Sequence, residues 1–426
     1  MDTLATSAPI TASANRLAGT WVGAADLRGI AARVGTPVFV YSEAQLVRNV
    51  ERIRAAAGAV GLVDRVELYV PFFPNANPHL LASLRDIPGV GLLVQIPSEH
   101  TLLTRFGFER FIVSPGHVSD EEIRHWGRLG YPTFLSSLDE VRCMLDADAP
   151  SVSVRIDSLG SEKPGVKYGQ LESLATMLRD AGRPMDCFEV YCGSGNSLEA
   201  MIEIVDQVFT IFTTHFPEAR SVNFAGGHGF DYAGWEEEGK HFDWTRYFQA
   251  VRELSAKHAV PDHVSFLFEP ARDVLADAGC LLLSVKRPIV TNPVSNLVVT
   301  DGSRMLMPSA QYRNRRHHAV FLGAGFEEIA EPAPGEGTPC VVRGRSILRN
   351  DYVLPGAYDV PPQVGAGGYM LILDAGAYCA TQHMEFLNVP PAAEVLVDRH
   401  GEPKLITQRG DDMDKWRHLT PERLSL

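Results

Sequence analysis

Two short segments of the 426-residue chain carry glycine, histidine and carboxylate side chains directly after apolar runs. In "FAGGHG" at 224–229, Gly226 and Gly227 follow a strand-like run, where glycines let backbone N–H groups approach and bind a phosphate. A tight turn that needs positive φ is the alternative explanation for both glycines. In "FEPARD" at 268–273, Glu269 follows an apolar run, which predicts a carboxylate at the end of a strand. A structural ion pair with Arg272 is the alternative role for this carboxylate.

The elements around these segments predict a barrel. Short strand-like runs alternate with amphipathic helical stretches over about 240 residues, which is typical of a (β/α)8 barrel with its functional residues at the C-terminal strand ends. A doubly wound open sheet is the alternative. Later strands have few helices between them, which predicts a β-rich domain, a sandwich or a barrel. We expect an N-terminal segment (1–41) that joins the β-rich domain, the barrel (42–282) and the β-rich domain (283–426).

Local signals near the N-terminus predict the first elements. The run "AADLRGIAARVG" at 24–35 has helical spacing and ends at Gly35, and "TPVFVY" follows it as a strand. Ser42 is then the expected N-cap of an amphipathic helix.

Composition excludes several classes of protein. A formal charge of -13 argues against nucleic-acid binding, and the six scattered cysteines include no CxxC pair, which argues against disulfide scaffolding and a structural zinc site. The N-terminal residues do not read as a signal peptide, and no apolar run reaches the ~18 residues that a membrane span needs. We therefore expect a cytoplasmic protein that binds neither metal, membrane nor nucleic acid.

The order and spacing of several motifs are similar to those of a known family. They resemble the fold-type III pyridoxal phosphate (PLP) decarboxylases, the diaminopimelate and ornithine decarboxylase family, over about residues 24–397. That resemblance implies an alanine-racemase-like (β/α)8 TIM barrel with a C-terminal β-rich domain. The motifs are "KYG" at 167–169, "CGS" at 192–194, "FAGGHGFDY" at 224–232, "FEPAR" at 268–272, "GRSILRND" at 344–351, "DAGAY" at 374–378 and "FLNVPPAAEVLV" at 386–397.

Most residues that hold the cofactor in this family have counterparts here. By resemblance, Glu269 lies beside the pyridine nitrogen and keeps it protonated, which makes the ring an electron sink. Tyr378 is similar to a tyrosine that reaches the phosphate bound by a partner subunit. Ala225 and Ala271 stand where the family has glycine. The implied cofactor-binding residues are Gly226, Gly227, Ser194, Glu269, Arg272 and Tyr378.

The residue that bonds covalently to the cofactor is missing. The family has Lys-Ala-Asn after its first barrel strand, and the lysine carries PLP. Here the matching triplet is "NAN", with Asn75 at the lysine position, and a shifted alignment places Phe73 or Pro74 there instead. None of the three has an amine.

The other differences from the family also fall at positions that take part in its reaction. Tyr191 replaces the histidine that stacks on the cofactor ring; a tyrosine ring stacks but supplies no imidazole proton near neutral pH. Ile347 replaces the cysteine that reprotonates the product, and Leu348 replaces the acid that binds the distal amine of the substrate. Asp351 is retained, which we interpret as structural.

Three functions stay open. The first is a divergent amino-acid decarboxylase-like lyase of specialised metabolism, which acts on a small amino-acid-derived substrate with PLP bound non-covalently or not at all. The second is a cofactor-independent decarboxylase or lyase that reuses the pocket. The third is a non-catalytic binding protein like the antizyme inhibitors. The candidate catalytic residues are Tyr191, Glu269, His228 and Asn75, with His79 as a further titratable candidate.

The resemblance also implies a partner. Family members form homodimers in which the β-rich domain of one chain completes the pocket of the other. Residues 344–351 and Tyr378 have that part here. We therefore expect a homodimer with a shared active site and a small-molecule substrate.

Overall fold

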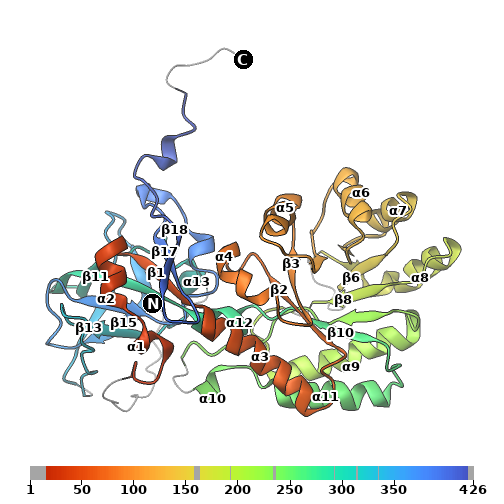
Figure 1. Ribbon diagram of the computed structural model, residues 1–426, viewed down its shortest axis with the longest axis horizontal. Coiled ribbons are helices and arrows are strands. Elements are labelled where there is room, and N and C mark those ends of the chain that lie inside the picture. Colours follow the sequence, from red (N-terminus) through yellow and green to blue (C-terminus); the bar gives the residue numbers. More distant parts are fainter. Residues whose placement is uncertain are drawn as a thin grey trace. The chain divides into compact units, whose positions relative to one another are not determined.

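The protein forms two compact units. The computed structural model describes residues 16–157, 164–191, 193–233, 237–291, 293–312, 315–333 and 335–420. The barrel unit is Leu46–Leu275, and the β-rich unit combines Met1–Gln45 with Ala276–Leu426 (Figure 1). The junctions thus fall at 45–46 and 275–276, whereas the sequence suggested 41–42 and 282–283. The second difference arises because the apolar run at 280–283 belongs to a strand of the β-rich unit rather than to the barrel.

The barrel unit is built on parallel strands whose order is β4-β3-β2-β10-β9-β8-β6-β5, with β7 beside β6. A parallel bridge between Val113 and Thr133 joins β4 to the segment that enters β5, so the sheet closes almost completely. The predicted (β/α)8 barrel is therefore confirmed, and the open doubly wound sheet is wrong. The strands are β2 (Val66–Pro71), β3 (Val90–Val94), β4 (Phe111–Val113), β5 (Phe134–Leu135), β6 (Ser153–Asp157), β7 (Val166–Lys167), β8 (Cys187–Val190), β9 (Ser221–Asn223) and β10 (Ser265–Phe268).

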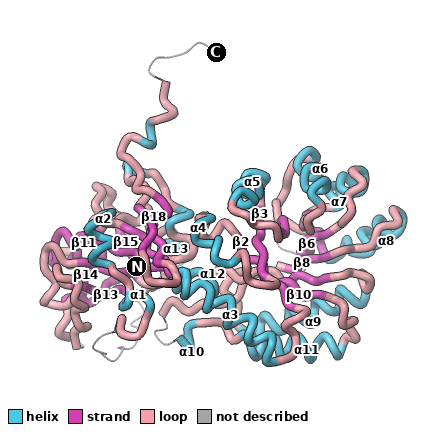
Figure 2. Tube along the Cα trace, in the orientation of Figure 1, coloured by secondary structure: helices cyan, strands magenta, loops and turns pink. Residues whose placement is uncertain are grey.

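Helices alternate with these strands along the chain, and in the barrel unit they lie outside the strands (Figure 2). Such right-handed β-helix-β crossovers are what bring parallel strands side by side. The helices are α3 (Glu43–Ala59), α4 (Pro78–Leu81), α5 (Pro97–Arg105), α6 (Asp120–Leu129), α7 (Leu138–Asp146), α8 (Leu171–Asp180), α9 (Leu198–His215), α10 (Glu237–Lys240), α11 (Trp244–Lys257) and α12 (Arg272–Leu275).

A buried apolar cluster lies among six of the barrel strands. Large residues fill the inside of an eight-stranded barrel, so such a barrel is a packed core rather than a pore. The members of this interior cluster are Tyr69, Leu93, Ile112, Phe134, Cys187 and Leu267. The polar residues at the strand ends lie next to this interior cluster.

The β-rich unit contains a mixed sheet with the order β15-β14-β12-β11-β1-β17-β18, in which β16 pairs with β11 and β13. This confirms the predicted β-rich domain. Its strands are β1 (Val38–Ser42), β11 (Gly279–Val290), β12 (Asn296–Thr300), β13 (Ala319–Leu322), β14 (Thr338–Arg343), β15 (Tyr352–Val360), β16 (Tyr369–Ile372), β17 (Ala393–Val397) and β18 (Pro403–Thr407), and its helices are α1 (Trp21–Ala24), α2 (Leu27–Val34) and α13 (Pro308–Tyr312).

The local signals near the N-terminus form the structures that they predict. Helix α2 starts after Asp26, whose side chain accepts from Gly29 N, and ends at Gly35 with φ of 70°. Ser42 is the last residue of β1, and its hydroxyl accepts from Gln45 N at 3.1 Å, so it does cap α3.

Two further findings concern membrane spans and cysteines among the described residues. Among the described residues, no helix has the length and apolar character needed to cross a membrane. Cys143, Cys187, Cys280, Cys340 and Cys379 are free and buried, while Cys192 lies outside the described residues.

Candidate active site

Phe73 lies where a barrel residue would face the interior from the end of β2. It is half-buried and packs against the interior cluster. Asn75 is 3% exposed, and its N–H bonds to Phe72 O at 3.2 Å in the turn that leads to α4. Of the proposed counterparts of the missing lysine, Phe73 therefore has the contacts of an inward-facing residue, and Asn75 belongs to the turn.

Glu269 directly follows β10 and is 7% exposed. Its N–H bonds to Ala225 O at 2.9 Å, and its Oε1 accepts from Asn223 Nδ2 at 2.7 Å. Burial and the neighbouring charge of Glu189 raise its pKa well above the usual range, against the opposing influence of Asn223 and Arg155. An asparagine of the neighbouring strand is therefore a hydrogen-bond partner of this carboxyl group.

Glu189 and Arg155 form the next part of the site. Arg155 on β6 is the register partner of Glu189 on β8, and Nη1 of the arginine lies 3.4 Å from Oε1 of the glutamate. Ser114 Oγ donates to Glu189 Oε2 at 3.4 Å. Glu189 is 1% exposed, and its burial raises its pKa although Arg155 and Ser114 favour the ionised form. A second buried carboxyl group thus faces the same side of the barrel as Glu269, two strands away and on the other side of Asn223.

Tyr191 follows β8 and is half-buried. The guanidinium carbon of Arg155 lies 4.9 Å from its ring centroid, a cation–π contact. Its hydroxyl is 2.9 Å from Ser194 Oγ. Tyr191 thus contacts both Ser194 and Arg155 at one edge of the barrel, and the expected contacts of Tyr191 and Ser194 with a cofactor ring and phosphate stay predictions.

The glycine segment is closely packed against neighbouring backbone. A Cβ on Gly227, where φ is +101°, would lie 2.3 Å from Gly193 O, and a Cβ on Gly226 would lie 2.9 Å from Glu269 O. The turn itself thus requires glycine, which is the alternative that the sequence left open, and phosphate binding by these N–H groups stays a prediction. Ala225 has φ of 54° and bonds through its N–H to Asn223 Oδ1 at 2.8 Å.

His228 lies in an aromatic core. Its ring is 4.2 Å from Trp244, 5.1 Å from Phe242 and 5.7 Å from Tyr247, centroid to centroid. Among the described residues neither ring nitrogen has a hydrogen-bond partner, and burial lowers the pKa to about 3. This environment favours a neutral, structural histidine, and the proposed catalytic role has no contact that supports it.

The further candidate His79, and one lysine near the strand ends, have contacts that account for them. His79 on α4 is exposed and packs edge-on against Phe106 in the helical layer, 4.9 Å between centroids. Lys167 Nζ donates to Asp157 Oδ2 at 2.7 Å at the C-terminal end of β6, where Asp157 is 3% exposed as a side chain. Lys167 therefore lies at the C-terminal end of the barrel strands, where the other site residues also lie. Lys163 lies outside the described residues.

The remaining predicted residues belong to the β-rich unit. Tyr378 is half-buried in the turn after β16, with φ of 60°. In the loop 344–351, Ile347 is 92% exposed. The Asp351 carboxylate accepts from Ser303 Oγ at 2.9 Å, Arg304 N at 2.8 Å and Ser346 N at 2.9 Å. These bonds give Asp351 a structural role in ordering the loop.

The barrel residues are better suited to contacts with the ring of PLP than to a covalent bond with PLP. Glu269 is a buried, hydrogen-bonded carboxyl at a strand end, which suits a protonated pyridine nitrogen, and Tyr191 and Ser194 lie at the same edge. At the end of β2, the apolar Phe73 packs against the interior cluster and has no amine. Among the described residues, no group of three or more His, Cys, Asp or Glu is arranged to hold a metal ion.

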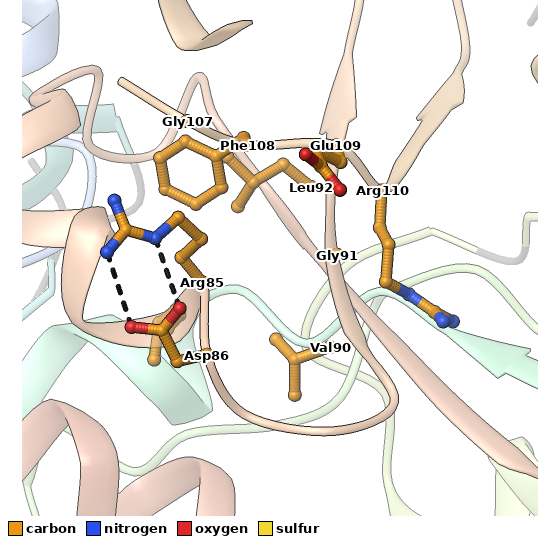
Figure 3. A pocket seen from close by; sticks show the side chains of 10 residues that line it. Arg85, Asp86, Val90, Gly91, Leu92, Gly107, Phe108, Glu109 and Arg110 are labelled. Carbon is orange, nitrogen blue, oxygen red and sulfur yellow. Dashed lines mark hydrogen bonds and ion pairs between the residues drawn. The ribbon is translucent and has the colours of Figure 1, made fainter.

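A separate cavity of about 260 Å³ lies at the opposite ends of the strands, before β3 and β4 (Figure 3). Arg85 and Asp86 form an ion pair on one side of it, 3.2 Å between Nε and Oδ1, and Phe108 lies over Arg85. Since active sites of such barrels lie at the C-terminal ends of the strands, we do not assign chemistry to this cavity.

The sequence analysis missed Arg155, Glu189 and Asn223. A signal was present for the first two, since parallel barrel strands are nearly continuous apolar runs and a charged residue within "VSVRID" or "CFEVYC" interrupts that pattern. Such an interruption indicates a residue that faces the barrel interior near its end.

Comparisons with known proteins agree with the geometry. No protein-family model matches the sequence. Diaminopimelate decarboxylase of Methanothermobacter thermautotrophicus is 24% identical over 430 residues, covering 95% of this chain and 96% of the relative, and that of Archaeoglobus fulgidus is 25% identical over 421 residues, covering 91% and 94%. The solved structure of Helicobacter pylori diaminopimelate decarboxylase complexed with L-lysine shares the fold, with a TM-score of 0.78 and 18% identity over 92% of this chain and 98% of the other.

Another solved structure extends the likeness. Vibrio vulnificus lysine/ornithine decarboxylase complexed with cadaverine has a TM-score of 0.71 and 16% identity over 87% of this chain and 97% of the other. The order of the motifs, the barrel with its β-rich unit and the sequence relatives over nearly the whole length lead to one conclusion. The chain is similar in sequence to diaminopimelate decarboxylases over nearly its whole length, and it shares the fold of the fold-type III PLP-dependent decarboxylases.

Proposed function

We propose that this protein is a divergent amino-acid decarboxylase that binds PLP without a covalent bond to lysine. The observation that carries the proposal is a contrast at the barrel edge: the buried Glu269 carboxyl is held by Asn223, while the side chain that packs inward just after β2 is the apolar Phe73. The relatives are named diaminopimelate decarboxylases, so removal of carbon dioxide from an amino acid is the reaction class that we carry over.

Each residue of the site has its own role in binding PLP. When bound, PLP supplies an electron sink for the electrons left on the substrate as carbon dioxide departs. Glu269 holds a proton at the ring nitrogen, and Asn223 orients its carboxyl group. Tyr191 stacks on the ring, and Ser194 with Gly226 and Gly227 binds the phosphate.

The substrate class follows from the apolar replacements. Leu348 stands where the family acid binds a distal amine, and Ile347 stands beside it. Neither side chain balances a positive charge, and burying an unpaired ammonium group is costly. We therefore propose a small amino-acid-derived substrate whose distal end is neutral or apolar.

Titration of the purified protein with PLP tests the proposal. We expect saturable binding by absorbance and fluorescence, with no lysine adduct after borohydride reduction and mass spectrometry. The Gly227→Ala variant should bind PLP at least about tenfold more weakly, because its Cβ would collide with Gly193 O and displace the turn. Gly58→Ala is the matched control, since a Cβ there meets nothing within 4 Å.

Two outcomes contradict the proposal. A lysine adduct would mean that a displaced lysine carries the cofactor, and Lys167→Met would show whether Lys167 is that residue. No binding would reject the use of PLP. The buried carboxyl pair would then favour the cofactor-independent lyase, since two acids with raised pKa values can act as general acid and base.

A further inference from the structure

Three charged side chains of the barrel are buried or nearly so at adjacent strand ends. Glu189 is 1% exposed and Glu269 is 7% exposed, and the side chain of Arg155 is 18% exposed. Glutamate is rarely buried in proteins unless a partner compensates its charge. Two carboxyl groups and one guanidinium therefore need an explanation.

Strand register brings these groups together on one face. Arg155 on β6 is opposite Glu189 on β8, and Glu189 is opposite Asn223 on β9. Asn223 is in turn opposite Leu267 on β10, two residues before Glu269, and its amide bonds to the Glu269 carboxyl. Residues in register on parallel strands point to the same side of the sheet, so the row runs from Arg155 to Glu269.

The charges in this row do not balance. Among the described contacts of the two glutamates, Arg155 is the cation: it lies 3.4 Å from Glu189, which also accepts from the neutral Ser114, while Glu269 accepts from the neutral Asn223. With both glutamates ionised, Arg155 would leave one negative charge uncompensated in a buried place. Two buried carboxylates that repel each other in this way favour retention of one proton by the pair.

We propose that Glu189 is a ligand-binding residue that acts as a pair with Glu269: the pair holds one shared proton in the free protein and releases it to solvent when a ligand with a protonated ring nitrogen binds. The released proton is taken up by buffer, and the cationic nitrogen replaces it as the balancing charge. This inference rests on the proposed function, because PLP is the ligand of this kind that we propose.

Isothermal titration calorimetry measures the proton directly. PLP is titrated into the intact protein at pH 7 in buffers of different ionisation enthalpy, and the slope of observed enthalpy against buffer enthalpy gives the protons released. Glu189→Gln leaves Arg155 balanced by Glu269 alone, so we expect the release to fall by about one proton per site. Glu269→Gln should give the same loss. Glu67→Gln, on β2 and paired with Arg110, is the matched control and should behave like the wild type.

A second measurement needs no ligand. Infrared spectroscopy of the free protein at pH 7 should show a protonated carboxyl band that disappears in both variants and persists in Glu67→Gln. Equal proton release in the wild type and both variants, or absence of the band from the wild type, would overturn the shared proton. If the band is present but PLP does not bind, the proposed function fails while the proton-sharing pair stands.

Discussion

His228 illustrates how a single buried side chain makes stability depend on pH. Its ring lies among Trp244, Phe242 and Tyr247, and burial lowers its pKa from 6.5 to about 3. The unfolded chain therefore binds a proton more readily than the folded protein between these two values. The stability linked to this residue is complete above about pH 6.5 and is lost as the pH falls toward 3.

We expect His228→Phe to reduce this acid sensitivity. At pH 5 the wild type should have lost about 2 kcal/mol of unfolding free energy through this residue, at ~1.4 kcal/mol per pH unit, and the variant should not. Urea unfolding at pH 7 and pH 5 measures the difference. The exposed His400→Gln is the control, and an equal acid-induced loss in wild type and His228→Phe would contradict the assignment.

The candidate site could be predicted only in part at this scale. Motif order identified Glu269, Tyr191 and Ser194, which the structure brings to one barrel edge. The choice between Phe73 and Asn75 depends on which residue faces inward at the end of β2, and that depends on contacts with other strands. Glu189 and Arg155 matter through strand register, which local sequence does not specify.

At the scale of elements, Asp273 ties the segment after β10 to two helices. Its Oδ2 accepts from Arg52 Nη2 on α3 at 2.7 Å and from Trp244 Nε1 on α11 at 2.6 Å, and its Oδ1 lies 2.8 Å from His241 Nδ1. Burial opposes ionisation, but the bond from His241 and the charge of Arg52 outweigh it and hold the pKa at about 2. This network anchors the chain just beyond Glu269.

We expect Asp273→Asn to destabilise the protein by about 3 kcal/mol, because Arg52 and His241 then lack a buried counter-charge. Chemical denaturation at pH 7 measures this loss. Asp86→Asn breaks the exposed pair with Arg85 and should cost less than about 1 kcal/mol. Since the folded pKa lies below the unfolded value of 3.8, the contribution of Asp273 persists above pH 4 and disappears as the pH falls to about 2. Similar losses in both variants would show that the network is unimportant.

Elements were predicted more successfully than side-chain partners, for a physical reason. The ends of α2 and α3 depend on Asp26, Gly35 and Ser42, whose capping bonds reach only three or four residues along the chain. The network of Asp273 joins residues more than two hundred positions apart, and no periodicity marks such a pairing.

At the scale of the whole molecule, the exposed Ile347 predicts an interface. It is 92% exposed in a loop that Asp351 holds in place, and this loop resembles the family segment that completes the pocket of the partner subunit. We predict a homodimer in which this loop meets the partner subunit. Ile347→Asp should weaken the dimer at least about tenfold in sedimentation experiments, because a buried carboxylate would lack a partner.

A matched change separates this effect from a general loss of apolar surface. Leu129, at the end of α6, is 40% exposed, and Leu129→Asp should leave the dimer intact. A monomeric wild type at micromolar concentration would refute the predicted dimer.

The position of β1 in its sheet has a consequence for synthesis on the ribosome. This strand is made early, yet it is hydrogen-bonded on one side to β11 and on the other to β17, near residue 395. All of Leu46–Leu275 is translated after β1 and before β11. The barrel can therefore close while β1 still lacks both of its neighbouring strands. During that interval the strand VFVYS, which is fully buried in the folded protein, lacks the neighbours that cover it. Slow elongation after residue 275 would lengthen this exposure, and chaperones that bind extended apolar segments would act there first.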